Sequence, residues 1–164
     1  VRGVEATTTT PKATYTTSVG NVANNGTLAV NRSDGITYSG VISGTGSVTN
    51  AGSGTFLLTG NNTYTGATAI SNGTLKVGSA TALGNASTVT VNNGASLDLN
   101  GQTMTSTGAL NLNGTGMSST GALTNSSTSA ATYAGAVSLA SAATINAAII
   151  RYRMARLLHF DQLC

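Results

Sequence analysis

The sequence predicts an all-β fold, a right-handed parallel β-helix in which successive coils stack along one axis. Short stretches that alternate apolar and polar residues recur between turns rich in Gly and Asn. Charged residues make up only 7% of the chain, so its surface depends on Thr, Ser and Asn, which suit strands and turns. Similar strand-and-turn units also return at roughly the length of one solenoid coil.

Composition limits the functional classes. A chain of 164 residues with 40% hydrophobic content is long enough for one domain with a core. The formal net charge is +3, but between residues 33 and 150 the charged residues are only Asp34, Lys76 and Asp98. Three of the seven basic residues lie in the last fourteen positions, so no basic stripe or aromatic platform indicates a nucleic-acid partner. No run of about 18 apolar residues predicts a membrane helix.

The first segment, residues 1–18, is rich in Thr and contains the single proline, Pro11. We interpret it as a linker or a frayed first strand. Residues 19–148 form the predicted β-helix. Asn25-Gly26, Asn72-Gly73 and Asn93-Gly94 each precede an alternating strand, and Asn-Gly is the pair best suited to positive φ.

Spacings between the leucines of these units bear on the architecture. Leu75 and Leu97 are 22 residues apart, about one coil, and Leu28 precedes Leu75 by 47 residues, about two coils. Leu97, Leu110 and Leu123 follow at steps of 13, which fit a strand spacing within one coil or a change in coil size. The region predicts about six coils. Spacing alone leaves an antiparallel sandwich as an alternative.

Stacked coils bury one side of every strand. The predicted inward ladders comprise Val41, Phe56, Leu58, Ile70, Leu75, Val77, Val89, Val91, Leu97, Leu99, Leu110 and Leu112. Asp98, between Leu97 and Leu99, is expected to point to solvent. The open ends of such a rod present bare strand edges, so end-to-end self-association is expected.

Residues 36–78 carry an ordered set of motifs: YSGVISG from Tyr38, GTFLLTG from Gly54, NTYTG from Asn62 and NGTLKVG from Asn72. The set resembles the autotransporter-associated β-strand repeat, also called the passenger-associated transport repeat. Ala67 stands where this family often has a second Gly, which predicts that the position needs no positive φ. The motif positions taken to matter are structural: Tyr38, Gly40, Gly44, Gly54, Leu58, Gly60, Asn62, Tyr64, Gly66, Gly73, Leu75, Val77 and Gly78.

The resemblance implies a fragment of a bacterial autotransporter passenger, a stalk exported by the type V route and located at the cell surface, in the outer membrane or in the medium. Its partner would be an outer-membrane translocator barrel outside this chain. A glycan- or host-surface-binding adhesin module is the alternative, and a polysaccharide-degrading β-helix is a more distant one.

No catalytic, cofactor-binding or metal site is predicted. Asp34 and Asp98 are 64 positions apart, and the body between residues 33 and 150 has no His and no Cys. The single cysteine, Cys164, ends the chain, so no intrachain disulfide is available. The chain is therefore not expected to be an enzyme.

The tail, residues 149–164, departs from this pattern. Ile150, Met154, Leu157 and Leu158 fall at helical spacing, interleaved with Arg. Three alternatives are an amphipathic cap on the last coil, a membrane-surface helix, and residues foreign to the solenoid. We expect the tail to be dispensable for the solenoid.

Overall fold

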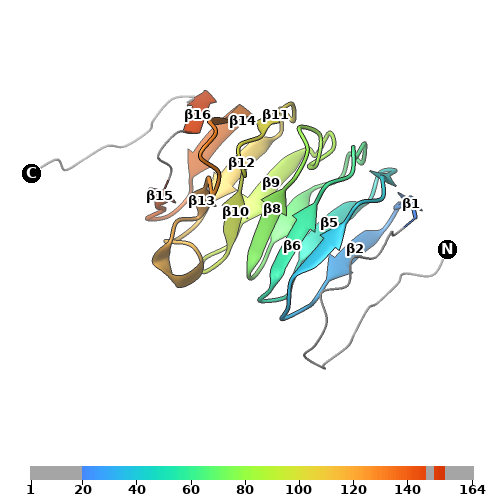
Figure 1. Cartoon of the computed structure of the whole chain (residues 1–164), viewed down its shortest axis with the longest axis horizontal. Helices are drawn as coiled ribbons and strands as arrows, with labels where there is room; N and C mark the ends of the chain where they lie inside the picture. The colour runs from blue at the N-terminus through green and yellow to red at the C-terminus, as the bar shows by residue number, and fades with distance from the viewer. Residues whose placement is uncertain (1–19, 147–149, 154–164) are drawn as a thin grey trace, which may run out of the picture.

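The computed structural model describes residues 20–146 and 150–153 and contains a parallel β-solenoid of about six coils (Figure 1). Every strand pair in it is parallel, which confirms the predicted all-β solenoid. The elements are β1 (Val22–Ala23), β2 (Thr27–Val30), β3 (Ile36–Tyr38), β4 (Ile42–Ser43), β5 (Ser47–Asn50), β6 (Thr55–Leu58), β7 (Thr68–Ile70), β8 (Thr74–Val77), β9 (Thr88–Val91), β10 (Ser96–Asp98), β11 (Thr103–Met104), β12 (Ala109–Leu112), the 3-10 turn η1 (Met117–Ser119), β13 (Leu123–Thr124), β14 (Ala131–Leu139), β15 (Ile145–Asn146) and β16 (Ile150–Arg153).

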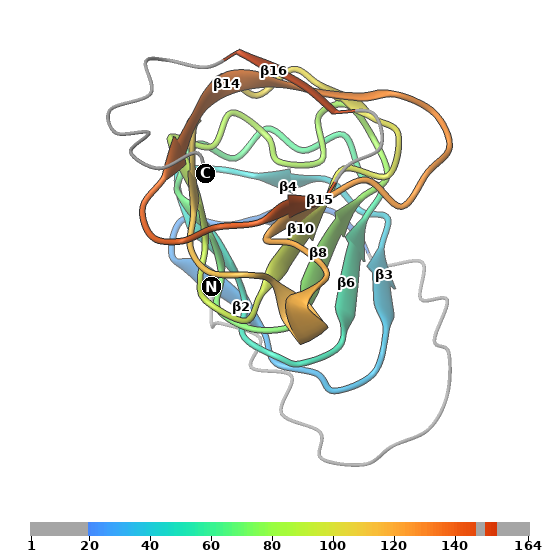
Figure 2. The ribbon, with the colours of Figure 1, turned by 90° about the vertical axis from the view of Figure 1, so that its left-hand side faces the viewer.

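Each coil has three faces, which surround a single core in the view along the rod (Figure 2). The second face is made by β2, β5, β7, β9, β12 and the end of β14, and the third face by β3, β6, β8, β10, β13 and β15. The first face holds β1, β4, β11, the start of β14, and β16. In the third and fourth coils the first face has irregular backbone instead of a strand. This backbone still bonds to the coil before: the Thr63 N–H donates to the Ile42 carbonyl, and the Asn85 N–H donates to the Tyr64 carbonyl.

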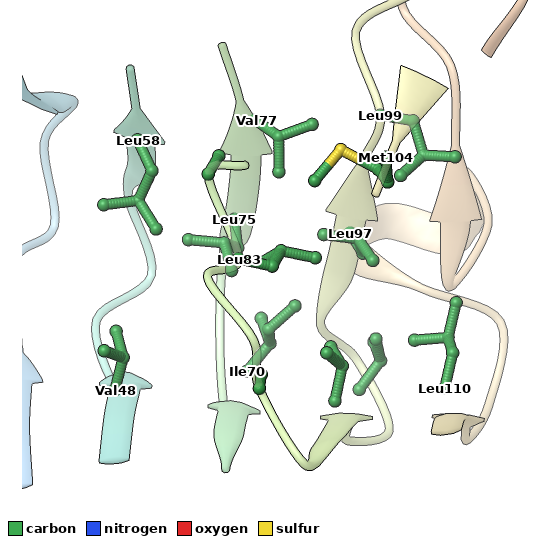
Figure 3. Close-up of a cluster of buried hydrophobic side chains, with 14 of the residues drawn as sticks. Val48, Leu58, Ile70, Leu75, Val77, Leu83, Leu97, Leu99, Met104 and Leu110 are labelled. Carbon is green, nitrogen blue, oxygen red and sulfur yellow. The ribbon is translucent and has the colours of Figure 1, made fainter. Parts of the chain in front are cut away.

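Inward side chains stack in register from coil to coil. On the third face Phe56 pairs with Leu75, Leu75 with Leu97, and Leu97 with Leu123, and all four side chains are buried. Figure 3 shows Leu75 and Leu97 of this ladder beside residues of the second face, which include Val48, Ile70 and Leu110. Because each strand is short, most of the stabilising apolar area comes from contacts between coils.

The predicted ladders are confirmed except at Val41, which is only half-buried. Ile42 is the inward residue of β4 and is fully buried. Adjacent residues of a strand point to opposite sides, and the strand here is only two residues long, so the sequence pattern was too short to set its register.

The leucine spacings also need one correction. Leu28 pairs with Val48 on the second face, so it does not precede Leu75 in one ladder, because Leu75 lies on the third face. The 13-residue steps are spacings within a coil, since Leu97 and Leu123 share the third face and Leu110 lies on the second. The 22-residue separation of Leu75 and Leu97 is confirmed as one coil.

The coils differ in length, and the longest separations between paired residues lie around residues 97–137. Paired residues are 20 positions apart between β2 and β5, and 26 apart between Leu97 and Leu123. The extra residues leave the solenoid in two excursions, 113–121, which contains η1, and 125–130. Two neighbouring serines in the first excursion, Ser118 and Ser119, have positive φ of 50° and 59°.

The helical expectation for the tail is wrong for residues 150–153. These residues form β16, which pairs with β14 in parallel, beginning with Ile150 opposite Ala131. The edge strand β14 offers unpaired backbone N–H and C=O groups. Hydrogen bonds to that edge favour a strand more strongly than the apolar spacing of so short a segment favours a helix. The Thr-rich segment 1–18 and positions 149 and 154–164 of the tail lie outside the described residues.

Candidate functional site

The repeat segment 36–78 runs from β3, at the end of the first coil, through the second and third coils. All its motif side chains larger than Gly point inward and are buried, namely Tyr38, Leu58, Asn62, Tyr64, Leu75 and Val77. Its glycines lie at the turns and corners where one coil meets the next, namely Gly40, Gly44, Gly54, Gly60, Gly66, Gly73 and Gly78. The structure thus brings the predicted motif residues together as a packing unit around the core.

Asn62 is the polar centre of this unit. Its side-chain Oδ1 accepts a hydrogen bond from the Ile42 N–H at 2.8 Å, and its Nδ2 donates to the Ala82 carbonyl at 2.6 Å. Ile42 belongs to the coil before and Ala82 to the coil after, so one amide joins three coils. Asn62 is 3% exposed, and its two partner residues are fully buried. The side chain supplies bonds that strands supply elsewhere, on the face where these coils have irregular backbone.

Tyr64 fills the core next to this amide. The tyrosine is fully buried, and its hydroxyl shares a hydrogen bond of 2.7 Å with the Thr68 hydroxyl, which is buried as well. Burial raises the pKa of Tyr64 well above its usual value. The phenol therefore stays neutral at physiological pH and acts as a packing group with a satisfied polar end.

Two glycines of the motif are required for different reasons. A Cβ on Gly66 would collide with the carbonyl oxygen of Gly46 in the coil before. Gly73 has a φ of 62°, in the left-handed region that favours glycine, and it also packs on Gly54. Ala67 has no positive φ, which confirms the expectation from the sequence.

The Asn-Gly turns are only partly as predicted. Gly73 and Gly94 take positive φ, at 62° and 82°, whereas Gly26 does not. At Gly26 the N–H donates instead to the side chain of Asn24, and that side chain bonds to the Ser47 carbonyl of the next coil. Turn type there is set by the stacking of a neighbouring coil.

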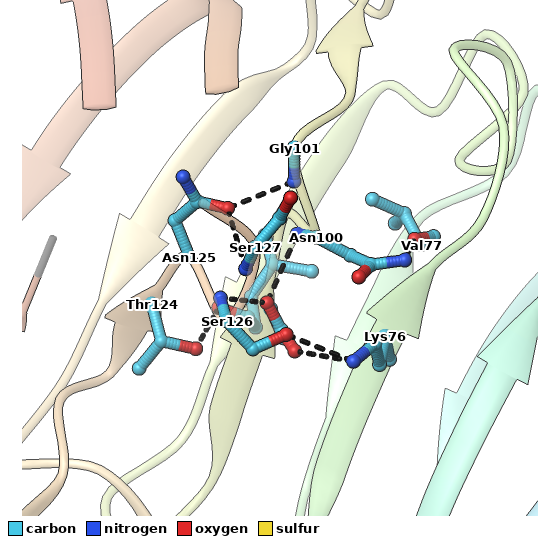
Figure 4. A network of polar contacts seen from close by, with 10 residues as sticks. Lys76, Val77, Asn100, Gly101, Thr124, Asn125, Ser126 and Ser127 are labelled. Carbon is cyan, nitrogen blue, oxygen red and sulfur yellow. Dashed lines mark hydrogen bonds and ion pairs between the residues drawn. The ribbon is translucent and has the colours of Figure 1, made fainter. Parts of the chain in front are cut away.

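Asp98 does not point to open solvent as the sequence predicts. It is 5% exposed and forms an ion pair of 3.4 Å with Lys76 from the preceding coil. One carboxylate oxygen also accepts the N–H groups of Asn100 and Ser126, each at 2.9 Å (Figure 4). The excursion 125–130 covers the carboxylate, and Lys76 donates to the Ser126 hydroxyl at 2.8 Å. This cluster fastens the excursion to the third face.

The other charged residue of the body is also engaged. Asp34 pairs with Arg32, whose hydrogen bond holds the pKa of that carboxyl below its usual value. Within residues 20–146 and 150–153, no group of three or more His, Cys, Asp or Glu is placed to hold a metal ion. In that same part of the chain no helix is long and apolar enough to span a membrane.

Sequence reasoning named Asn62 only as a motif position and missed the bonding role of the buried asparagines. Asn24, Asn50 and Asn62 are each buried at a corner, and each bonds through its side chain to the backbone of a neighbouring coil. The buried asparagines are separated from other Asn residues by about one coil or half a coil. Surface turns of this chain are also rich in Asn, so this spacing does not distinguish buried from exposed asparagines.

Comparison with known proteins supports the sequence resemblance. Residues 48–77 match the passenger-associated-transport-repeat family, from Val48 in β5 to Val77 at the end of β8. The matched residues include Asn62, whereas its partners Ile42 and Ala82 lie on either side of them, and the predicted resemblance is confirmed for these residues. No curated protein and no solved structure gives a significant match to the chain. A parallel β-solenoid with this repeat fits the stalk of an autotransporter passenger, and the family implies a surface or secreted location.

Proposed function

We propose that this chain is a structural segment of an autotransporter passenger, a stalk that helps the passenger fold after export and holds other segments away from the cell. Its route would be type V secretion, with an outer-membrane translocator barrel as partner. The observation that carries the proposal is that the matched repeat, residues 48–77, folds as part of a parallel solenoid and contains Asn62, which joins the coils on either side of it.

The architecture suits export of an unfolded chain. Each coil contacts mainly its neighbours, so folding can proceed coil by coil as the chain emerges. Residues 1–163 contain no cysteine, so no disulfide can form within this body during transit. The Asn62 bridge would favour orderly growth because its amide is satisfied only when three successive coils are in place.

An export experiment tests the proposal. The full chain is placed between an export signal and a translocator barrel, and its display is measured by external protease and antibody labelling of intact cells. We expect wild type to be displayed, and we expect a variant with residues 48–77 in scrambled order to accumulate inside. Equal display of the two chains would contradict a role of the repeat in export, provided that both are made in equal amounts.

A glycan-binding module is the second candidate. Along the outside of the second face, Thr49, Ala69, Thr90, Asn111 and Ser138 occur in register, so this face offers hydroxyl and amide groups without charge. Such a row favours a neutral polar ligand over an anionic one. Selective binding on a glycan array, lost when Thr49 and Thr90 are changed to Ala, would promote this role. We assign no enzymatic step, because Asp34, Lys76 and Asp98 all form ion pairs.

A further inference from the structure

We propose that Asn93 is a site of spontaneous deamidation in the folded protein, and that the four other Asn-Gly pairs are protected. The chain has five such pairs, at residues 25–26, 72–73, 93–94, 100–101 and 113–114. Asn-Gly is the dipeptide in which the following backbone nitrogen is least hindered, because glycine has no side chain. The sequence alone therefore ranks all five alike.

The reaction needs only water. The backbone nitrogen of the glycine loses its proton and attacks the side-chain carbonyl carbon of the asparagine. A C–N bond forms to give a cyclic imide, the bond to the side-chain nitrogen breaks, and ammonia leaves with the proton. Water then opens the imide at either carbonyl, which yields aspartate or isoaspartate. No group is oxidised or reduced.

A folded chain permits this attack only where the glycine N–H and the asparagine amide are unbound and the peptide can rotate. Asn93 and Gly94 lie in the exposed turn between β9 and β10, closed by the Ala95 N–H donating to Asn92 at 3.0 Å. Within the described residues, neither the Asn93 side chain nor the Gly94 N–H makes a hydrogen bond. Asn93 packs against Gly114 of the next coil, and the space beside Gly94 is open.

The other four pairs are held by neighbouring coils. At 100–101, Asn100 donates to the Val77 carbonyl and the Gly101 N–H donates to Asn125. At 113–114, the side-chain amide donates to the Val91 carbonyl and the glycine N–H donates to Ser141. At 25–26, the side chain accepts from Thr45 and the glycine N–H donates to Asn24.

The pair Asn72-Gly73 is the closest match to Asn93-Gly94, because it occupies the equivalent turn of the preceding coil, between β7 and β8. Its backbone is tied to Asn50 of the coil before by two bonds: the Asn72 carbonyl accepts the Asn50 side-chain amide at 2.9 Å, and the Asn72 N–H donates to the Asn50 carbonyl at 3.3 Å. Gly73 is buried against Gly54. Rotation of this peptide would break these bonds and open the contact between coils.

Conversion of Asn93 would change a nearly uncharged surface. It adds one carboxylate to a body that carries three charged residues between positions 33 and 150, and it lowers the formal net charge of +3 by one. The isoaspartate product also lengthens the backbone of the turn. The folded solenoid would thus accumulate a single defined charge variant with age.

The test is incubation of the folded full chain in neutral buffer, followed by peptide mapping that separates Asn, Asp and isoaspartate at each pair. A parallel sample in denaturant provides the unfolded reference. Two hydrogen bonds must open at a protected pair, so we expect Asn93 to convert roughly 10- to 30-fold faster than the others when folded. In denaturant all five should convert at similar rates.

The variant Asn93→Gln keeps an amide but disfavours the five-membered ring, so it should remove the early acidic species on native isoelectric focusing. Asn72→Gln serves as the matched control and should leave that species in place. Equal conversion of Asn72 and Asn93 in the folded protein, or no preference for Asn93 over the other pairs, would overturn the proposal.

Discussion

Replacing Asn62 with Ala removes the amide that joins three coils. The variant leaves the Ile42 N–H and the Ala82 carbonyl without their partners, and both residues are fully buried. A buried polar group left unsatisfied costs about 1–3 kcal/mol, so two groups predict a loss of about 2–6 kcal/mol in the free energy of unfolding. A typical domain has a free energy of unfolding of roughly 5–15 kcal/mol, so this loss is a large part of the total. A substantial fraction of the variant should therefore be unfolded under mild denaturing conditions.

Urea denaturation followed by far-UV circular dichroism measures this loss. Asn61→Ala is the matched control, because Asn61 is exposed and its side chain, within the part of the chain that the structure describes, accepts one hydrogen bond, from the Thr81 hydroxyl at 3.0 Å. It should change the free energy of unfolding by less than about 0.5 kcal/mol. Hydrogen exchange adds a local readout: the Ile42 amide should lose protection in the Asn62→Ala variant, while the Val48 amide, bonded to the Ala67 carbonyl, keeps it.

Asn62→Asp separates the two halves of the bridge. The new carboxylate still accepts from Ile42, but it opposes the Ala82 carbonyl in a buried position, so its folded-state pKa should lie above the ordinary value. The stabilising protonated form is fully present below the unfolded-state pKa, and its contribution is lost as pH rises through the higher folded-state pKa. This variant should therefore regain stability in acid, unlike Asn62→Ala. Equal stability of Asn62→Ala and wild type would refute the reasoning.

Three further predictions concern the core, the third face and the tyrosines. Leu75→Ala should cost about 2–5 kcal/mol in thermal or urea unfolding, whereas Leu57→Ala, on the outward side of the neighbouring strand, should cost less than about 1 kcal/mol; equal effects would show that the register is wrong. Asp98→Ala should speed limited proteolysis within residues 125–130, whereas Asp98→Asn, which keeps the acceptor for the two N–H groups, should do so much less; unchanged cleavage in both would argue against the clamp. Burial raises the pKa of Tyr133 to about 12, so its contribution to stability is complete below about pH 10 and is lost as pH rises toward that value; Tyr133→Phe should show a smaller alkaline loss, and an unchanged slope would contradict this.

Much of the fold could be predicted from local pattern. Residues such as Leu75, Val77, Leu97 and Leu99 alternate regularly after a turn, and their inward positions are confirmed by the structure. The resemblance of residues 36–78 to the transport repeat also needed only the order of short motifs. These features are readable because a solenoid repeats the same local solution in every coil.

The register of short strands could not be predicted from the sequence alone. Val41 and Ile42 are adjacent, and both are apolar and β-branched. Only the burial of Ile42 in the folded chain shows which one turns inward. Leu28 and Leu75 follow similar turns but lie on different faces, because coils of about 20 residues have three short sides with a similar alternating pattern. A one-dimensional spacing does not distinguish the faces of such a coil.

The sequence by itself determined the class of this protein: a charge-poor chain of short alternating strands and Asn and Gly turns that stacks into parallel coils and carries a passenger-associated transport repeat. Only the tertiary structure decided the roles of single polar residues. It turned Asp98 into a buried clamp and made Asn62 a bridge between coils. It also tied the Asn72 backbone to Asn50, whereas the Asn93 side chain has no hydrogen-bond partner among the described residues. The physical reason is that hydrogen-bond partners in a solenoid lie about one coil away in the chain, so a local pattern describes the turn but not its neighbour.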